Sequence, residues 1–466
     1  MASQEPAENY DLLILGSGTG AKLLAWTFAG RGERVAVVER KYVGGSCPNI
    51  ACLPSKNIIR SAQVAHDVRR SREFGISIDG FSVDMSAVRD RKRRMVQGLI
   101  DTHLALYKQS GAELIMASGR FVAPRTIEAE LSDGTKRLLR GERVVICTGT
   151  HAAIDHHIPG LIAAQPLTHI EALEIDVVPE HLIILGGGYV GLEFAQAMSR
   201  FGSKVTVIDR NHRVINREDD DVTEGLQQLL EDEGVEFVFN ATVKSVSGVS
   251  GKTVNLALEH NGTDRSLAGT HLMLAAGREP NTKGIGLEVA GVELTEHGYI
   301  KVNEHLETTA PHVWAVGEVA GSPQFTHISE DDFRVVRDSI LGGPRVTTGR
   351  QVPFCLFTDP EFARVGLTEK EAKAQGIPYR LFKVPMSAVL RARSLMETRG
   401  FLKCLVEAES DRILGFTAFG VGAGEIMGCV QIAMLGGMPY TALRDAVLAH
   451  PTIPEGLIGL FSFGAV

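Results

Sequence analysis

The sequence predicts an α/β protein with two Rossmann-like dinucleotide-binding domains and a C-terminal α+β domain. A β run at residues 10–15 leads into a glycine-rich turn, an amphipathic stretch and a second β run at residues 35–38. Together these segments make one βαβ unit. A second copy begins near residue 181. From residue 350 onward, strand-like runs alternate with glycine-rich turns and an apolar helix, which indicates a separate α+β domain.

The bulk composition fits a multidomain globular enzyme. The chain has 466 residues, of which 44% are hydrophobic and 22% charged, and a chain of this length is expected to form about three domains. Its formal net charge of −8 argues against nucleic acid or an anionic membrane as the main partner. The first six residues have neither a basic run nor an apolar core, so we expect no signal peptide and a cytoplasmic location.

The first glycine-rich turn carries a dinucleotide-binding fingerprint at Gly16, Gly18 and Ala21. The glycines let the backbone turn tightly and approach a pyrophosphate at the N-terminus of a helix. Glu39 ends the second β run, at about the distance (about 20 residues) from which an acidic side chain accepts from a ribose hydroxyl. We expect a dinucleotide to bind here.

The second copy repeats the fingerprint with Gly186, Gly188 and Gly191, and Asp209 takes the acidic position. Two such units indicate two dinucleotides, and electron transfer between them is the natural reason to hold both. Asp209 favours a free 2′-hydroxyl, because a 2′-phosphate would face a carboxylate.

Two arginines keep the alternative nucleotide open. Arg210 and Arg213 follow Asp209 directly and are able to pair with a 2′-phosphate instead. We expect NADH to be the preferred donor, with NADPH as the alternative.

Cys47 and Cys52 lie five positions apart in a segment, residues 44–56, that also contains glycines, prolines and a lysine. A helix that begins near this segment would bring the two side chains onto successive turns, close enough to bridge. Helix N-terminal amides would lower a thiol pKa and keep one sulfur as the thiolate that exchange chemistry requires. A zinc site would need more ligands at short spacing, and we expect no metal site. The segment predicts a catalytic redox pair.

The remaining cysteines and the charge runs have plainer interpretations. We expect the four isolated cysteines to be small buried hydrophobic residues; these are Cys147, Cys355, Cys404 and Cys429. Residues 60–110 have a helical pattern, and the basic run at 89–94 predicts a solvated helix face. The acidic run at 219–221 predicts the charged first turn of a helix that contains Leu226 and Leu229.

Four further segments follow in order, at residues 144–149, 275–281, 309–318 and 450–455. With the fingerprints and the cysteine segment, they resemble the class I pyridine nucleotide–disulfide oxidoreductases, the family of glutathione reductase, dihydrolipoamide dehydrogenase and mercuric reductase. The resemblance covers essentially the whole chain. It implies an enzyme that uses FAD and a nicotinamide cofactor.

The resemblance implies a role for each residue of the redox site. Cys47 would be the interchange thiol that attacks the substrate, and Cys52 the thiol that contacts the flavin. Lys56 would lie beside flavin N5 and pair with Glu193. Tyr189 would be the aromatic lid that covers the flavin and swings away when nicotinamide binds.

The resemblance also assigns two sets of cofactor-binding residues. Those expected to bind FAD are Gly16, Gly18, Gly20, Ala21, Glu39, Arg40, Gly45, Ser46, Thr148, Gly149, Gly317, Glu318 and Thr326. Those expected to bind NAD(P) are Gly186, Gly188, Tyr189, Gly191, Asp209, Arg210, Gly277 and Arg278. Residues 1–154 and 276–349 would form the FAD-binding domain, 155–275 the NAD(P)-binding domain, and 350–466 the dimerisation domain.

His450 and Glu455 are implied to act across a subunit interface. His450 would be the acid–base for Cys47, and Glu455 would orient it, both from the partner subunit of a homodimer. This is chemically sensible, because a histidine exchanges a proton near neutral pH and a carboxylate on its far nitrogen fixes its tautomer.

Several positions depart from the family pattern. Ala51 stands where a glycine usually precedes the second cysteine, which reduces local backbone freedom, and Glu318 replaces the usual aspartate. Cys147 replaces a common alanine. The last residues, 460–466, contain no cysteine pair for handing over metal, so mercury is not expected as the dedicated substrate.

Within the family, residues 322–334 and 390–393 are similar to the bacterial reactive-chlorine-resistance flavoproteins, which resemble mercuric reductase. This similarity implies a small oxidant as substrate, either hypothiocyanous acid or a metal ion such as Cu(II) or Hg(II). Glutathione reductase is disfavoured by Asp209 and Gly191. The main alternative is a dihydrolipoamide dehydrogenase, possible as a subunit of a 2-oxo-acid dehydrogenase complex, and an unassigned disulfide or quinone reductase also stays open.

Overall fold

The structure is a computed structural model that describes residues 6–466. Residues 1–5, which begin the predicted FAD-binding domain and the segment judged not to be a signal peptide, lie outside the described residues. The chain forms two compact units. The first contains the described residues up to Asn57 together with Ser86–Ala153 and Gly277–Arg350, and the second contains Ile58–Met85, Ile154–Ala276 and Gln351–Val466.

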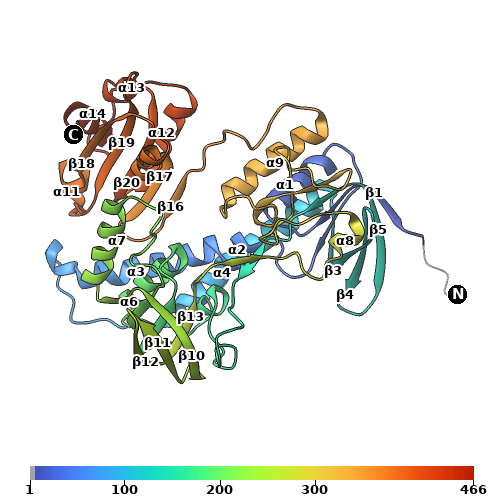
Figure 1. Ribbon diagram of the computed structural model, residues 1–466, viewed down its shortest axis with the longest axis horizontal. Helices are drawn as coiled ribbons and strands as arrows, with labels where there is room; N and C mark the ends of the chain where they lie inside the picture. Colours follow the sequence, from blue (N-terminus) through green and yellow to red (C-terminus); the bar gives the residue numbers. More distant parts are fainter. Residues whose placement is uncertain (1–5) are drawn as a thin grey trace. The chain divides into compact units, whose positions relative to one another are not determined.

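A six-stranded sheet forms the centre of the first unit (Figure 1). Five strands run parallel in the order β3–β2–β1–β5–β15, and β4 pairs antiparallel with both β3 and β5. The five residues of β2 are all buried, as expected for a parallel strand covered on both faces. The strands are β1 Glu8–Leu15, β2 Val35–Glu39, β3 Glu113–Ala123, β4 Thr126–Leu131, β5 Lys136–Ile146 and β15 Val313–Ala315.

Helix α1, Thr19–Ala29, begins directly after the first fingerprint turn and buries Leu24 and Phe28. These two residues are four apart, so they lie on one face of the helix, in the same core cluster as Leu12 and Ile14 of β1. The other helices and short strands of this unit are α2 Ser46–Ile50, α8 Leu287–Ala290, η2 Gly317–Ala320, α9 Thr326–Leu341, β6 Thr150–Ala152 and β14 Arg278–Pro280. Helices α3 Cys52–Arg69 and α4 Met85–Ser110 are divided between the two units.

The second unit contains the second βαβ copy. Its parallel sheet has the order β13–β7–β8–β9, and a three-stranded antiparallel sheet, β10–β11–β12, shares a core with it. The elements are α5 His169–Ala172, β7 His181–Leu185, α6 Tyr189–Phe201, β8 Lys204–Ile208, α7 Asp220–Asp232, β9 Val235–Val238, β10 Ala241–Val249, β11 Thr253–His260, β12 Thr263–Gly269 and β13 His271–Leu274, preceded by η1 Ser71–Phe74.

The C-terminal part of the second unit is a five-stranded antiparallel sheet, β16–β17–β20–β19–β18, packed against α12 (Figure 1). Its elements are β16 Phe354–Leu356, β17 Glu361–Gly366, α10 Glu369–Ala374, β18 Tyr379–Pro385, η3 Met386–Ala388, α11 Leu390–Leu395, β19 Phe401–Glu407, β20 Ile413–Gly420, α12 Ala423–Leu435, α13 Tyr440–Arg444 and α14 Gly456–Phe463. The predicted fold class, two Rossmann-like domains and an α+β domain, is confirmed.

Three local expectations were wrong. The helical stretch predicted over residues 60–110 is interrupted, because Gly75 adopts a left-handed conformation after η1 and α4 begins only at Met85. The basic run is not a wholly solvated face, since Lys92 is buried with 2% exposure. Cys429 is exposed on α12, whereas Cys147 and Cys404 are buried as expected.

Candidate active site

The cysteine segment folds as a short helix followed by the start of a long one, and not as one continuous helix. Cys47 lies in α2, the helix stops at Ala51, which has φ −135° and ψ −103°, and Cys52 is the first residue of α3. The φ of Ala51 is negative, so this position does not require glycine. The break turns the two cysteines toward each other, since the Cys47 thiol is hydrogen-bonded to Cys52.

Both cysteines are free thiols in this structure. The hydrogen bond with Cys52, followed by burial, raises the pKa of Cys47. The expected lowering of a thiol pKa is therefore not found at Cys47. The Sγ of Cys52 lies 3.2 Å from Oγ1 of Thr326, the first residue of α9. Thr326, which was predicted to bind FAD, therefore lies beside Cys52.

The first fingerprint forms a close-packed cradle. A Cβ on Gly16 would lie 2.3 Å from the carbonyl oxygen of Cys147, so only glycine fits there. Gly45 approaches equally closely, because a Cβ on it would be 2.6 Å from Cα of Gly18. Burial raises the pKa of the Cys147 thiol to about 12, which makes it unreactive. Because Gly45 meets Gly18, the loop that precedes Cys47 packs directly against the first fingerprint turn.

Glu39 is buried at the end of β2 and organises the same cradle. One of its carboxylate oxygens accepts from the amide and hydroxyl of Ser17, at 2.9 and 2.8 Å. The other accepts from the amides of Lys41 and Tyr42, at 2.7 and 2.9 Å. This arrangement, with glycines that leave room for a pyrophosphate and an acid at the strand end, fits a bound FAD.

Other residues predicted to bind FAD gather near the start of β6. Glu318 bonds to the hydroxyl of Thr150 and lies 3.2 Å from Nε of Arg278. The Thr148 hydroxyl donates to the carbonyl of Asn281 at 2.9 Å. Arg278, which was predicted to bind NAD(P), is engaged here with Glu318 and lies with Gly277 in the first unit.

The second fingerprint lies in the second unit and packs more tightly still. A Cβ on Gly186 would be 2.5 Å from the carbonyl oxygen of Ala275, and a Cβ on Gly191 would be 2.0 Å from that of Gly186. Asp209 accepts from the amide of Gly187 at 2.6 Å and from the amide of Asn211 at 2.7 Å. The carboxylate is thus fixed at the end of β8, where a ribose is expected.

Arg213 is held away from the role of a phosphate ligand. Its guanidinium lies 2.5 Å from the carboxylate of Asp220 and 3.3 Å from the hydroxyl of Thr223. A 2′-phosphate would have to compete with this ion pair and face the fixed carboxylate of Asp209. Arg213 is therefore already engaged by side chains of its own unit.

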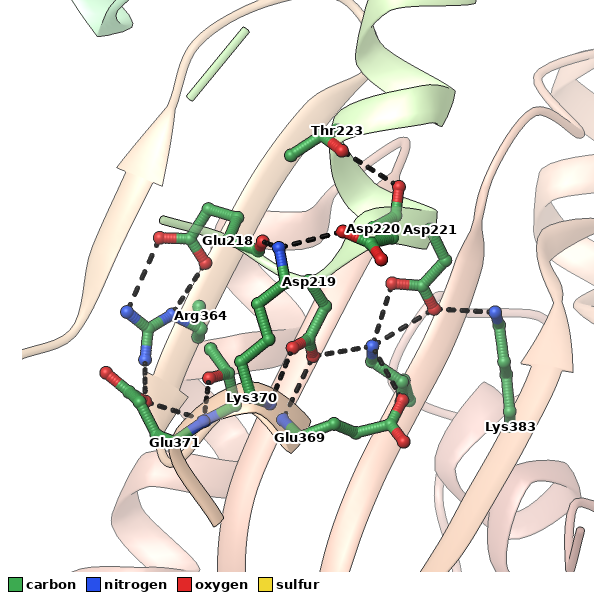
Figure 2. Close-up of polar contacts among 12 residues, drawn as sticks. Glu218, Asp219, Asp220, Asp221, Thr223, Arg364, Glu369, Lys370, Glu371 and Lys383 are labelled. Carbon is green, nitrogen blue, oxygen red and sulfur yellow. Dashed lines mark hydrogen bonds and ion pairs between the residues drawn. The ribbon is translucent and has the colours of Figure 1, made fainter. Parts of the chain in front are cut away.

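Tyr189, the predicted lid, is the first residue of α6, and its side chain has two defined contacts. Its ring centroid is 5.5 Å from that of Phe354, and its hydroxyl donates to Glu218 at 3.4 Å. Burial, followed by the charge of Glu218, raises the pKa of Tyr189. Glu218 is in turn paired with Arg364 at 3.0 Å (Figure 2). Sequence analysis missed both Glu218 and Arg364, because nothing in either local pattern indicates the other.

The acidic side chains of Asp219, Asp221 and Glu369, labelled in Figure 2, surround a buried lysine in the second unit. Lys403 is completely buried, and its Nζ lies 2.8 Å from Asp219, 2.9 Å from Asp221 and 3.2 Å from Glu369. The acidic run does begin α7, with Leu226 and Leu229 buried as predicted. Its first residue, Asp219, is nevertheless buried against a lysine and not solvated. The cluster joins the nucleotide-binding part of the second unit to the five-stranded sheet.

Of the remaining predicted catalytic residues, His450, Glu455 and Glu193 lie in the second unit. Nδ1 of His450 is 2.9 and 3.0 Å from the two carboxylate oxygens of Glu455. The His450 side chain is 61% exposed, so the imidazole is available to react with a molecule outside the chain. Glu193 accepts from the amide of Phe357 at 3.0 Å. Lys56 lies in the first unit, in the second turn of α3.

Two kinds of feature are absent from residues 6–466. No helix there is long and apolar enough to cross a membrane. The same residues include no cluster of three or more histidine, cysteine or acidic side chains arranged to hold a metal ion.

Comparisons with known proteins agree with this arrangement. The family model for pyridine nucleotide-disulphide oxidoreductases matches residues 10–332, and the model for their dimerisation domain matches residues 352–459. The probable pyridine nucleotide-disulfide oxidoreductase RclA of Escherichia coli is 35% identical over 97% of this chain and 99% of its own length. The dihydrolipoyl dehydrogenase of Bacillus subtilis is 32% identical over 97% of both chains. A solved structure, the Cu(II) complex of the HOCl-induced flavoprotein disulfide reductase RclA from E. coli, matches with a TM-score of 0.89 and 33% identity, over 98% of this chain and 99% of that one.

Proposed function

Because the chain belongs to the pyridine nucleotide-disulphide oxidoreductase family, we propose that it passes electrons from NADH through FAD to a Cys47–Cys52 disulfide and on to a small oxidant. The observation that carries this proposal is the hydrogen-bonded cysteine pair at the start of α3, on the loop that packs against the first fingerprint. A dithiol at this position is able to close to a disulfide and open again.

The cradle around Gly16, Gly18 and Glu39 would hold FAD, with Thr326 beside the cysteines. Bound FAD supplies a carrier that accepts two electrons from a nicotinamide and releases them as a pair. The second fingerprint would hold the nicotinamide nucleotide, and Asp209 would bond to its ribose. NADH is the proposed donor, because Arg213 is already paired with Asp220.

The chain's own chemistry takes place at the two sulfurs. Two electrons and two protons convert the disulfide into the dithiol. The Cys47 thiolate then attacks the sulfur of hypothiocyanous acid, which forms a Cys47–S–SCN bond and releases hydroxide. The Cys52 thiolate attacks Sγ of Cys47, which restores the disulfide and releases thiocyanate. The net reaction oxidises NADH and reduces hypothiocyanous acid to thiocyanate and water.

We further propose a homodimer in which the His450–Glu455 pair of one subunit serves the cysteines of the other. The dimerisation domain supports this arrangement, because its surface carries large exposed apolar side chains. Ile432 and Leu435 on α12 are 67% and 63% exposed, and Phe463 on α14 is 86% exposed. Cys429 lies on the same helix face as Ile432, so an interface here would cover it. The Ile432→Glu variant should be monomeric by light scattering.

We also propose the domain roles predicted from the sequence and a location in a reducing cytosol, where a disulfide is more often catalytic than structural. The dihydrolipoamide dehydrogenase alternative shares the redox pair and the cofactors. It differs in substrate and in docking onto an acyltransferase core.

Parallel assays of the purified flavoprotein test the substrate. We expect NADH-dependent turnover with hypothiocyanous acid, little reduction of glutathione disulfide, and little oxidation of dihydrolipoamide with NAD⁺. NADH-dependent reduction of Cu(II) and of Hg(II) is measured in the same series. A second series uses NADPH in place of NADH. Fast dihydrolipoamide oxidation without turnover of the small oxidants would overturn the substrate proposal. Full activity in the Cys47→Ser variant would overturn the proposed role of the cysteine pair.

A further inference from the structure

Lys22 is a mostly buried lysine in the first unit with an unusual partner. It lies in α1, directly after Ala21 of the first fingerprint. Its Nζ is 2.8 Å from Nε2 of His103 on α4. Among the residues that the structure describes, Lys22 forms no ion pair with a carboxylate. A buried ammonium without a counter-charge is costly, so its position calls for a functional explanation.

The positive charge of this pair resides on the lysine. Burial and the neighbouring charge of Lys22 lower the pKa of His103 to about 4, so the ring is neutral at pH 7. Nε2 therefore accepts from the ammonium, and Nδ1 carries the ring hydrogen. Nδ1 is buried and finds no hydrogen-bond partner within residues 6–466. The ring stacks on Trp26, with centroids 5.9 Å apart, so the histidine is a rigid support for the lysine.

The same histidine packs against the loop that leads to Cys47. A Cβ on Gly44 would lie 2.7 Å from Nδ1 of His103, so the ring touches the backbone there. Gly45 lies against Gly18 on the other side. Lys22, on the helix that follows the first fingerprint turn, is thus linked to the cysteine loop through His103.

The groups that face Cys47 act in opposite directions. The hydrogen bond with Cys52, burial and the charge of Cys52 raise the pKa of Cys47, whereas the Thr326 hydroxyl and the charge of Lys22 lower it. Burial lowers the pKa of Lys22 itself, against the opposing charges of Cys47 and Cys147. Lys22 is the cation in this set, since His103 is neutral.

We propose that Lys22 is a positioning residue that stabilises the thiolate of Cys47, with His103 holding its ammonium beside the cysteine loop. The inference rests on the proposed role of Cys47 as the attacking thiol. It explains how a buried thiol that shares a proton with Cys52 is ready to attack an oxidant at neutral pH, because the nearby cation offsets the loss of hydration.

The test measures the thiol directly and does not depend on turnover. In the flavin-containing Cys52→Ser protein, Cys47 is alkylated with iodoacetamide at a series of pH values, and the labelled peptide is quantified by mass spectrometry. The reagent is neutral, so Lys22 does not affect its approach by charge. The compared variants are Lys22→Gln, Lys22→Met and Lys22→Arg. Lys41→Gln, an exposed lysine beside Tyr42, is the matched control.

We expect Lys22→Gln and Lys22→Met to shift the alkylation profile to higher pH and to slow the reaction about tenfold at pH 7, which corresponds to about one pH unit. Lys22→Arg and Lys41→Gln should keep the parent profile. Coincident profiles for Lys22→Gln and the parent would overturn the inference, and so would an equal shift in Lys22→Arg, because charge would then not be the cause.

Lys22→Gln keeps a donor for His103, so it provides the comparison if Lys22→Met does not fold. The Cys47→Ser assay tests the role of Cys47 separately, so the two failures are distinguishable.

Discussion

Lys403 on β19 and Asp219 at the start of α7 form a buried ion pair with a 2.8 Å contact, although they lie 184 positions apart in the sequence (Figure 2). Neither side chain reaches solvent to a useful extent, at 0% and 5% exposure. The pair connects the nucleotide-binding part of the second unit to its antiparallel sheet. Its strength therefore bears on how firmly the two parts are joined.

The Lys403→Met variant should lose stability, because it leaves the carboxylates of Asp219, Asp221 and Glu369 without their shared cation. Removing one partner of a buried pair costs about 3–5 kcal/mol. The loss is measured as the change in the free energy of unfolding in urea. The exposed pair of Arg399 with Asp232, which also joins α7 to the sheet, is the control, and Arg399→Met should cost about 1 kcal/mol or less. Equal losses would contradict the assigned importance of the buried cluster.

The same pair has a definite pH dependence. Burial alone would raise the pKa of Asp219, but hydrogen bonds from Lys403 and from the amides of Lys370 and Glu369 lower it below its ordinary value. A carboxylate with a depressed folded-state pKa contributes stability that is present above its unfolded pKa and is lost as the pH falls through the folded value. Asp219→Asn should therefore reduce the loss of stability below about pH 4. An unchanged acid limb of the unfolding curve would contradict this assignment.

Gly191→Ala and Gly188→Ala should affect different properties, the first the folding stability and the second the binding of the nucleotide. A Cβ on Gly191 meets the Gly186 carbonyl at 2.0 Å, whereas a Cβ on Gly188 meets nothing within 4 Å. Gly191→Ala should lower the free energy of unfolding by about 2 kcal/mol through overpacking. Gly188→Ala should keep the parent stability and bind NADH more weakly, because the second glycine of such a turn lets the backbone approach the pyrophosphate. Thermal unfolding and calorimetric titration with NAD⁺ distinguish the two effects.

Glu39→Ala should release FAD. The substitution leaves the amides of Ser17, Lys41 and Tyr42 without their acceptor in a buried loop, at about 1–3 kcal/mol for each unsatisfied group. The FAD content of the purified protein, from its absorbance ratio, should fall well below that of Glu33→Ala, a residue that pairs with Arg143 elsewhere in the same unit. Full flavin content in Glu39→Ala would show that the carboxylate does not organise the cradle.

Glu455→Gln should slow the reaction with the oxidant and leave reduction of the flavin by NADH unchanged. The carboxylate holds Nδ1 of His450, and the amide is a weaker acceptor for that hydrogen. We expect the oxidant-dependent rate to fall about tenfold, and about a hundredfold in His450→Gln. Stopped-flow measurements separate the two half-reactions, and Glu409→Gln in the same domain is the control. Equal slowing of both halves would remove His450 from the proposed proton transfer.

Local pattern predicted much of this molecule correctly. Short continuous apolar runs, glycines at turn positions and an acid at each strand end depend only on nearby residues, so they indicated both Rossmann units and the cradle around Gly16 and Glu39. The five-position spacing of Cys47 and Cys52, in its segment, likewise indicated the redox pair. Family resemblance supplied His450 and Glu455, whose side chains are in contact.

Other features depend on distant partners, so the sequence alone gave no indication of them. The break at Ala51 turns the cysteines together where a single helix was expected. Arg278 pairs with Glu318, 40 positions away, and Lys92 is buried in a run that was expected to be solvated. Whether a charged or sulfur-containing side chain is buried is set by what the tertiary fold brings against it.

The sequence by itself therefore determined the two nucleotide-binding units and the C-terminal α+β domain and indicated the proposed redox cysteines, because the backbone geometry of each is encoded within a short stretch. Only the tertiary structure decided that Lys22 meets His103, that Lys403 meets Asp219 and that Tyr189 meets Glu218. Those contacts join segments far apart in the chain, and the electrostatic energy of each depends on distance and burial, which no local pattern of residues contains.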